Sequence, residues 1–229
     1  MKFFLIPVLL ISISCCKIKE KQIKQLALKT QASIKPTINY DSCKTTIQLN
    51  KLKQKPLWRN LSKSIKEKIF ICSVVETIIP AWIGTAWDFN GISETPQKGS
   101  IACGYFVTTV LRDAGLALSR VKLAQCASEQ MITKLVQSKY ISRFSNVALE
   151  DFIESIKKDG YGLYIIGLDN HTGFIYNNGK DIFFIHSTFL GTRNVQKEDA
   201  PTNQILKQSK YKVLGKISSD EMVLERWIN

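Results

Sequence analysis

The sequence predicts an α+β domain in which N-terminal helices pack on a C-terminal antiparallel sheet. In the first part of the chain, apolar residues recur at steps of three and four, which is the period of an amphipathic helix. After Gly160 the pattern changes to short runs rich in β-branched and aromatic residues, which is typical of strands. With 229 residues, 45% of them hydrophobic, the chain can bury a core, and this composition excludes a wholly disordered or fibrous protein.

Four helices are expected before Gly160. The first covers residues 57–79, whose apolar side chains form a helical stripe, and Pro80 is expected to end it. After a glycine-rich loop, a second helix begins near Cys103 and is capped at its C-terminus by Gly115. Two further helices are expected near residues 128–136 and 149–157.

Strands are expected at residues 163–168, 171–176, 181–189 and 211–217. Asn178-Gly179 lies between the second and third of these, and this dipeptide favours a two-residue hairpin turn because both residues tolerate positive φ. In such a hairpin, residues whose numbers add to 357 face each other, and the only two histidines, His171 and His186, meet this condition. We therefore expect their imidazoles to be close enough to hydrogen-bond, so that one fixes the tautomer of the other. The alternatives are a chance structural pair and a register shifted by a bulge.

Cys103 is the candidate nucleophile. It follows the glycine-rich loop and stands in the first turn of the second helix. A helix N-terminus lowers the pKa of a thiol and directs free backbone N–H groups toward a developing oxyanion. The alternative is a small buried residue, which is what most free cysteines are.

The N-terminus is typical of an exported protein. Lys2 is followed by a twelve-residue apolar stretch, residues 3–14, which is too short to span a membrane and has the length of a signal-peptide core. The stretch ends at Ser14-Cys15-Cys16, which resembles a bacterial lipobox and makes Cys15 the expected lipidation site. Lipidation of Cys16 and ordinary cleavage of a secreted protein are the alternatives.

The net charge of +13 is concentrated near the N-terminus. Residues 17–68 hold 14 basic and 3 acidic side chains, whereas residues 69–229 are nearly neutral. This distribution disfavours a nucleic-acid enzyme, which would carry positive charge around its site, so no nucleic-acid partner is expected. We expect a signal peptide at 1–15, a basic linker at 16–45 that contacts an anionic membrane surface, and one domain at 46–229.

The cysteines and histidines do not form a metal-binding pattern. Six cysteines are present, but no CxxC pair occurs and no carboxylate cluster accompanies the two histidines, so neither a metal nor an organic cofactor is expected. The states of Cys43, Cys72 and Cys126 are left open, with Cys43–Cys72 as the least objectionable disulfide.

Several short motifs between residues 83 and 187 resemble the NlpC-type cell-wall peptidases, which are papain-like cysteine hydrolases of bacterial peptidoglycan. Cys103-Gly104-Tyr105-Phe106-Val107 is similar to the Cys-Ser-Gly-Phe-Val of that family. His171-Thr172-Gly173-Phe174-Ile175-Tyr176 and Phe184-Ile185-His186-Ser187 are similar to its His-Val-Gly-Ile-Tyr and Phe-Ile-His-Ala segments. The loop from Ile83 to Gly91 resembles the family's Gly-Thr-Pro-Tyr loop, with Trp87 in the place of the tyrosine.

The resemblance implies a papain-like hydrolase domain with Cys103 as nucleophile, His171 as general base and His186 as the residue that orients it. It also implies that Trp87, Cys103 and Gly104 lie near the oxyanion and substrate. Ala102, Tyr105 and Trp87 depart from the family pattern near the substrate pocket. Arg120 and Gln125 also match the family, but we interpret them as a solvated charge and a loop amide.

The expected function is hydrolysis of amide bonds in peptidoglycan stem peptides by an exported, membrane-anchored protein. Two alternatives are the same site acting on another amide or ester, such as a lipid, and a catalytically inactive wall-binding lipoprotein.

Overall fold

A computed structural model describes residues 39–229. The expected signal peptide, the lipobox with Cys15 and Cys16, and most of the basic linker lie outside the described residues. Among the residues that are described, no helix has the length and apolar character needed to cross a membrane.

The sheet has six antiparallel strands in the order β1-β6-β2-β3-β4-β5. The strands are β1 (Ile141–Ser145), β2 (Gly162–Leu168), β3 (Thr172–Asn177), β4 (Ile182–Ser187), β5 (Val195–Asp199) and β6 (Tyr211–Gly215). The four expected strands are therefore confirmed as β2, β3, β4 and β6. The two strands that were not expected, β1 and β5, form the edges of the sheet and carry polar and charged side chains, as edge strands commonly do.

The first expected helix is present, with different ends. A 3₁₀ turn, η1 (Lys55–Asn60), comes first and has Pro56 as its second residue. After it, α3 (Lys63–Ile71) passes through the π-helix η2 (Cys72–Ile78) into α4 (Ile79–Trp82). The expectation that Pro80 ends the helix is wrong. Pro80 occupies one of the first two positions of α4, where a backbone N–H is not needed for an intrahelical bond, so the helix continues to Trp82.

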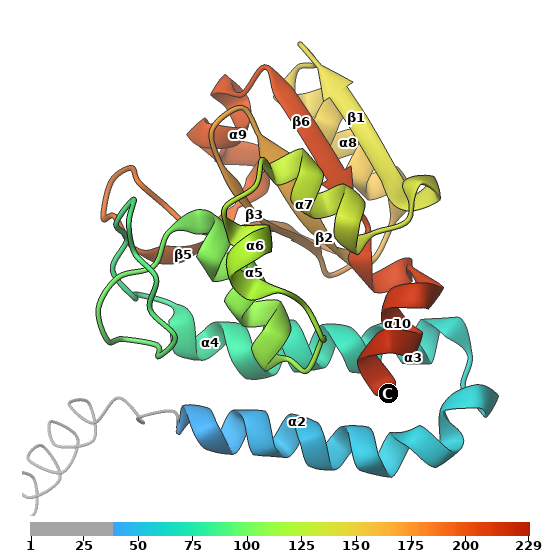
Figure 1. The fold of residues 1–229 in the computed structure, drawn as a ribbon. Helices are drawn as coiled ribbons and strands as arrows, with labels where there is room; N and C mark the ends of the chain where they lie inside the picture. The colour runs from blue at the N-terminus through green and yellow to red at the C-terminus, as the bar shows by residue number, and fades with distance from the viewer. Residues whose placement is uncertain (1–38) are drawn as a thin grey trace, which may run out of the picture. The chain divides into compact units, whose positions relative to one another are not determined.

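Helix α2 (Tyr40–Gln54) begins inside the segment expected to be a linker, and it lies beside α3 and α4 in Figure 1. Asn39 caps it by accepting the Ser42 N–H at 3.1 Å. The Tyr40 hydroxyl donates to Asp113 at 2.7 Å and accepts from the Trp82 indole at 2.9 Å, which ties α2 to the body. The linker boundary at 45 was therefore too late. The helix was missed because it buries a single residue, so it shows no apolar stripe.

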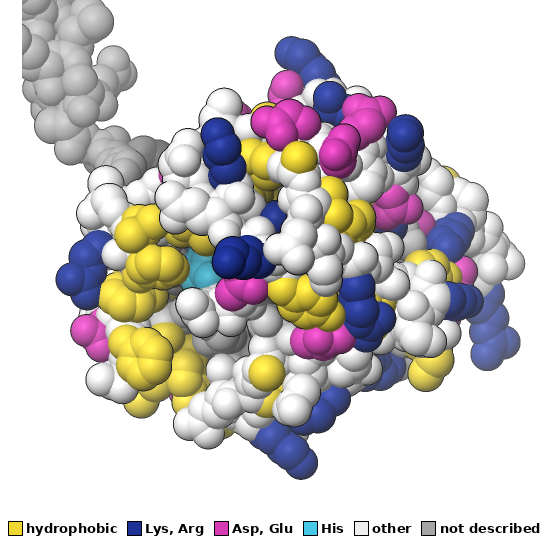
Figure 2. All heavy atoms as spheres, turned by 90° about the horizontal axis from the view of Figure 1, so that it is seen from above, with side chains coloured by type: hydrophobic (Ala, Val, Ile, Leu, Met, Phe, Trp, Pro, Cys, Tyr) yellow, Lys and Arg dark blue, Asp and Glu magenta, His cyan; other side chains and the backbone are white. Residues whose placement is uncertain are grey.

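The remaining expected helices are confirmed as α5 (Cys103–Asp113), α7 (Ser128–Leu135) and α8 (Leu149–Asp159). Gly115 follows α5 with φ +95°, as expected of a C-terminal glycine. Short segments also occur between the longer elements: α6 (Arg120–Ala124) between α5 and α7, η3 (Ser138–Tyr140) between α7 and β1, and η4 (Ala200–Thr202) and α9 (Gln204–Gln208) between β5 and β6. The chain then passes through η5 (Ile217–Ser219) and ends in α10 (Glu221–Ile228). The α+β class is therefore confirmed. On the face shown in Figure 2, basic and acidic side chains are interspersed.

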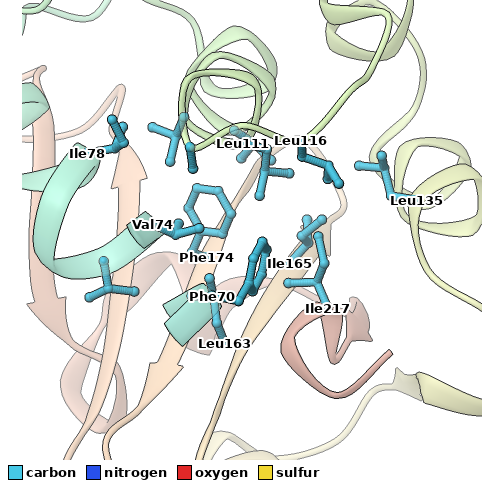
Figure 3. Packing of buried hydrophobic residues seen from close by; sticks show 14 of the residues in the cluster. Phe70, Val74, Ile78, Leu111, Leu116, Leu135, Leu163, Ile165, Phe174 and Ile217 are labelled. Carbon is cyan, nitrogen blue, oxygen red and sulfur yellow. The ribbon is translucent and has the colours of Figure 1, made fainter. Parts of the chain in front are cut away.

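Helices cover both faces of the sheet. On one face, Phe70 and Val74 from the first helices pack with Leu111 of α5 and Phe174 of β3, all inaccessible to solvent (Figure 3). On the other face, α8 packs its buried side chains against Tyr164, Ile166 and Phe184. The ring of Phe106 in α5 lies 5.9 Å from that of Phe174 in an edge-to-face contact, which holds the start of α5 close to β3.

Candidate active site

The hairpin of β3 and β4 has a different register from the one expected. Phe174 pairs with Ile185 and Asn177 with Ile182, so facing residue numbers add to 359 and not to 357. The Asn178 side-chain oxygen accepts the N–H groups of Lys180 and Asp181, and Gly179 has φ +93°. Gly179 and Lys180 are therefore the central residues of the turn. The expected turn was one residue too early, because Asn178 acts through its side chain and does not need a positive φ.

The two histidines nevertheless meet on one face of the sheet. Continuing the observed register places Gly173 opposite His186, and His171 lies two residues before Gly173 on the same face. A Cβ at position 173 would lie 2.8 Å from the Cβ of His186, so only glycine leaves room there. The His171 ring reaches diagonally across this gap, and its Nε2 lies 2.8 Å from Nδ1 of His186. The expected imidazole contact is thus present, although the direct opposition was wrong.

A carboxylate extends this pair. His186 is fully buried, and its Nε2 lies 2.7 Å from Oε2 of Glu198 on β5. Asn203 donates to the same oxygen at 3.0 Å while its own carbonyl oxygen caps α9. The Phe184 ring stacks on His186 with 3.8 Å between centroids. These contacts define a hydrogen-bonded His171–His186–Glu198 chain with His186 held on three sides.

The carboxylate determines which ring nitrogen of His171 is free. A hydrogen bond to an ionised Glu198 requires a proton on Nε2 of His186, so Nδ1 of the neutral ring is an acceptor. His171 must then donate from its Nε2 to that acceptor. Nδ1 of His171 therefore keeps its lone pair and is the nitrogen that can accept a proton.

The pKa shifts agree with neutral rings and an ionised carboxylate. Burial, and then the neighbouring His186, lower the pKa of His171 to about 3. Burial also lowers the pKa of His186, and the hydrogen bond to Glu198 opposes this shift. The bond to His186 lowers the pKa of Glu198 more than burial raises it. At neutral pH both imidazoles are therefore uncharged.

Cys103 occupies the N-terminal residue of α5, as expected, and Ala102 before it has extended backbone. Burial raises the pKa of its thiol, while the backbone N–H groups of Thr172, Gly104 and Cys103 itself act in the opposite direction. The expectation of a depressed thiol pKa is wrong, because desolvation outweighs these amides. Since Thr172 follows His171 directly, the thiol lies at the start of β3. Within residues 39–229 no hydrogen bond joins the Cys103 sulfur to His171 or His186.

Cys103 and His171 line one cleft of about 690 Å³, and the expected oxyanion residues Trp87 and Gly104 line it with them. Figure 2 shows a histidine side chain, in cyan, at the bottom of a hollow beside a cluster of hydrophobic side chains. Glu198 instead borders a separate cavity of about 370 Å³. The buried His186 therefore lies between the cleft and a second opening to solvent. The structure brings all expected site residues among 39–229 to this region.

Arg120 was interpreted as a solvated charge and Gln125 as a loop amide, and for Arg120 this is wrong. Its side chain is 8% exposed, donates to the Ile92 and Ser93 carbonyls at 2.8 and 3.0 Å, and lies over the Tyr105 ring. Gln125 donates to the Tyr105 hydroxyl at 3.1 Å and lines the cleft. Both side chains therefore position Tyr105, which forms part of the cleft wall. A Cβ on Gly104 would lie 2.5 Å from the Ala124 carbonyl, so glycine allows α6 to approach α5.

Glu198 and Asn203 were missed from the sequence. Glu198 stands in the polar segment Val195–Asp199, which does not have the apolar alternation that marks a strand. No sequence signal joins it to His186, since their contact depends on β5 pairing with β4.

The structure also bears on metals and disulfides. Across the described part of the chain, no group of three His, Cys, Asp or Glu side chains is arranged to hold a metal ion. Cys43, Cys72, Cys103 and Cys126 are free, so the Cys43–Cys72 bridge is not formed.

No protein-family model matches the sequence, and no curated protein or solved structure matches it. The class of the protein is therefore defined by its own fold and site. It is an α+β protein in which a thiol at a helix N-terminus and a carboxylate-linked histidine pair meet at one cleft.

Proposed function

We propose that this protein is a papain-like cysteine hydrolase that cleaves amide bonds by acyl transfer through Cys103. The observation that carries the proposal is the His171–His186–Glu198 chain, which leaves one unprotonated ring nitrogen at the cleft that Cys103 lines. A thiol, a base and a group that orients the base are the three parts that nucleophilic catalysis of this type requires.

The proposed reaction begins from the neutral pair. Nδ1 of His171 takes the thiol proton as the Cys103 sulfur attacks the substrate carbonyl carbon, and the carbonyl electrons move to oxygen. The tetrahedral intermediate collapses, and the amine leaves with the proton from His171. Water then gives a proton to His171 and attacks the thioester carbonyl carbon. The C–S bond breaks, the carboxylic acid leaves, and His171 returns the proton to the Cys103 sulfur.

Charge stabilisation comes from the residues around the sulfur. The Cys103 N–H at the start of α5 has no intrahelical partner, and we assign it as the first donor to the oxyanion. The Trp87 indole N–H, which has no hydrogen-bond partner among residues 39–229, is the second donor we assign to the oxyanion. Glu198, through His186, stabilises the positive charge that forms on His171.

The resting geometry requires one adjustment before reaction. The thiol is held near the Thr172 amide and not against the imidazole. Catalytic hydrogen bonds are often longer without substrate and shorten in the Michaelis complex, so we propose that substrate binding turns the sulfur toward Nδ1 of His171.

The resemblance to NlpC-type peptidases supports peptidoglycan stem peptides as the substrate to test first. Purified peptidoglycan is digested with the full-length protein, and the fragments are analysed by mass spectrometry. Cleavage should produce fragments with a new amine and a new carboxyl group. If the fragments are unchanged while the same enzyme hydrolyses another amide or ester, the substrate is wrong and the chemistry stands. If Cys103 reacts with neither substrates nor thiol probes, a wall-binding protein without activity is the better description.

The proposed location is the outer face of a membrane, with the basic segment near anionic lipid headgroups. Metabolic labelling with a lipid precursor is expected to mark the wild type and not a Cys15→Ala, Cys16→Ala double variant. Unlabelled wild-type protein would instead indicate simple secretion.

Glu198 gives a prediction that separates orientation from folding. Glu198→Ala removes the charge-assisted hydrogen bond to His186, so we expect kcat to fall about 10- to 10²-fold with little change in KM. In the NMR spectrum of this variant, the proton on Nε2 of His186 should no longer have the chemical shift of a proton hydrogen-bonded to a carboxylate. Asp199→Ala, on the same strand with an exposed side chain, is the matched control. Equal activity of the two variants would contradict the assigned role.

A further inference from the structure

We infer that the cleft beside Cys103 binds an apolar acyl chain, so that the preferred substrates are long-chain acyl amides or esters. This inference rests on the proposed function, because it names the substrate class of the same site. Three properties of the cleft support it: the wall has no charged residue, its large apolar side chains are exposed to solvent, and a second cavity adjoins it beside His171.

The cleft wall contains no charged residue. The chain has 32 basic and 19 acidic residues, yet none of the thirteen lining residues is Lys, Arg, Asp or Glu. The wall consists of aromatic and aliphatic side chains, three amides, the histidine and the thiol: Trp87, Phe89, Asn90, Ile92, Ala102, Cys103, Gly104, Tyr105, Ala124, Gln125, Asn170, His171 and Phe189. Mostly apolar walls with a few polar groups are typical of sites for small apolar ligands.

Large apolar side chains of this wall are exposed to solvent. Phe89 is 80% exposed, Ile92 is 59% exposed and Phe189 is 38% exposed. Single exposed apolar residues are ordinary, but these three border the cleft that also contains the nucleophile. An acyl chain laid against them would remove both its own surface and theirs from water.

The apolar surface continues past the catalytic base. A smaller cavity of about 200 Å³ shares Asn170, His171 and Phe189 with the cleft and adds the apolar residues Leu168, Leu190 and Ile205. Its one carboxylate, Asp169, already accepts the backbone N–H groups of Lys210 and Tyr211. The smaller cavity also contains Gln208 and Ser209, so its wall mixes apolar and polar residues, whereas the larger cleft is mostly apolar. We assign the larger cleft, which includes Cys103, to the acyl chain.

A short charged peptide fits this wall less well. Its carboxylates and ammonium group would lose water without an opposite charge in the lining, which is unfavourable. Two guanidinium groups lie against aromatic rings of this wall, Arg193 over Trp87 at 4.8 Å and Arg120 over Tyr105 at 4.7 Å from the ring centroid, and neither arginine lines the cleft itself. An uncharged acyl chain needs no such partner.

The test measures binding separately from turnover. The full-length chain carrying Cys103→Ala is titrated with acetyl, hexanoyl and decanoyl glycinamide and with a γ-glutamyl dipeptide, and Trp fluorescence or calorimetry gives the affinity. We expect affinity to rise about two- to fourfold for each added methylene until the cleft is filled. The charged dipeptide should bind no better than the acetyl compound.

Two variants locate the effect. Phe89→Ser and Ile92→Ser should reduce the dependence on chain length, whereas Leu52→Ser, at a 67% exposed position on α2, should leave it unchanged. Circular dichroism confirms that each variant is folded. Binding that does not depend on chain length, or that favours the dipeptide, overturns the inference. If binding follows chain length but the wild type hydrolyses none of these compounds, the acyl site stands and the proposed chemistry falls.

Discussion

Cys103→Ala is expected to abolish hydrolysis, with a fall in kcat/KM of at least about 10⁴-fold. The variant has no sulfur to attack the carbonyl, and the imidazole has no nucleophile to activate. The measurement is the initial rate of hydrolysis of an activated ester or of a peptidoglycan fragment. Mass spectrometry of an acid-quenched reaction should show an acyl group on Cys103 of the wild type and no acyl group on the Cys103→Ala protein.

Cys72→Ala is the matched control for this experiment. Cys72 is also a free cysteine, but it is exposed on η2 and does not line the cleft. Its replacement should leave both the rate and the acyl adduct unchanged. Residual activity in Cys103→Ala near that of Cys72→Ala would remove Cys103 from the mechanism.

His171→Ala has the second largest expected effect, a fall in turnover of about 10³- to 10⁴-fold. The reason is the raised pKa of the Cys103 thiol, which leaves it protonated at neutral pH and dependent on a base. In both the wild type and His171→Ala, the rate at which iodoacetamide alkylates Cys103 should therefore keep increasing with pH beyond the ordinary pKa of a thiol. An alkylation rate that reaches its plateau near pH 6 would indicate a resting thiolate–imidazolium pair and contradict this account.

The same residue gives a pH dependence of stability. The pKa of His171 is about 3 in the folded protein and about 6.5 when unfolded, so between these values only the unfolded chain binds the proton. The stabilisation is complete above pH 6.5 and is lost as pH falls toward 3. Between pH 7 and pH 5 the free energy of unfolding should decrease by about 2 kcal/mol more in the wild type than in His171→Ala. Urea unfolding at the two pH values measures this difference, and equal slopes would contradict a buried neutral His171.

The contact between the two histidines was predicted correctly although the predicted register of the hairpin was wrong. Asn178-Gly179 correctly placed a tight turn between two strands, and the turn centre differed by one residue. Moving the centre of the turn by one residue shifts the pairing between β3 and β4 by two residues. Side chains on a strand point alternately to its two faces, so a shift of two leaves both histidines on the same face of the sheet. Gly173, without a side chain, then allowed the diagonal contact.

The helix ends show the opposite case. Pro80 was expected to end a helix because proline cannot donate a hydrogen bond in a helix interior. The π-helix before it changes the local hydrogen bonding, and Pro80 falls at the start of the next segment. Val74, Ile78 and Trp82 of these segments have no solvent exposure, so the whole run from η2 to α4 is packed into the core.

The sequence by itself determined the α+β class, the position of Cys103 at a helix start and the shared face of the two histidines. Each of these follows from local spacing and turn chemistry, which involve residues near one another in the chain. Only the tertiary structure decided that Glu198 completes the hydrogen-bonded chain, that Arg120 is buried under the cleft wall, and that the thiol pKa is raised. The Glu198 contact arises from the pairing of β5 with β4, and the other two properties arise from burial of the Arg120 guanidinium and the Cys103 thiol away from water. Strand pairing and burial cannot be predicted from the spacing of residues along the chain.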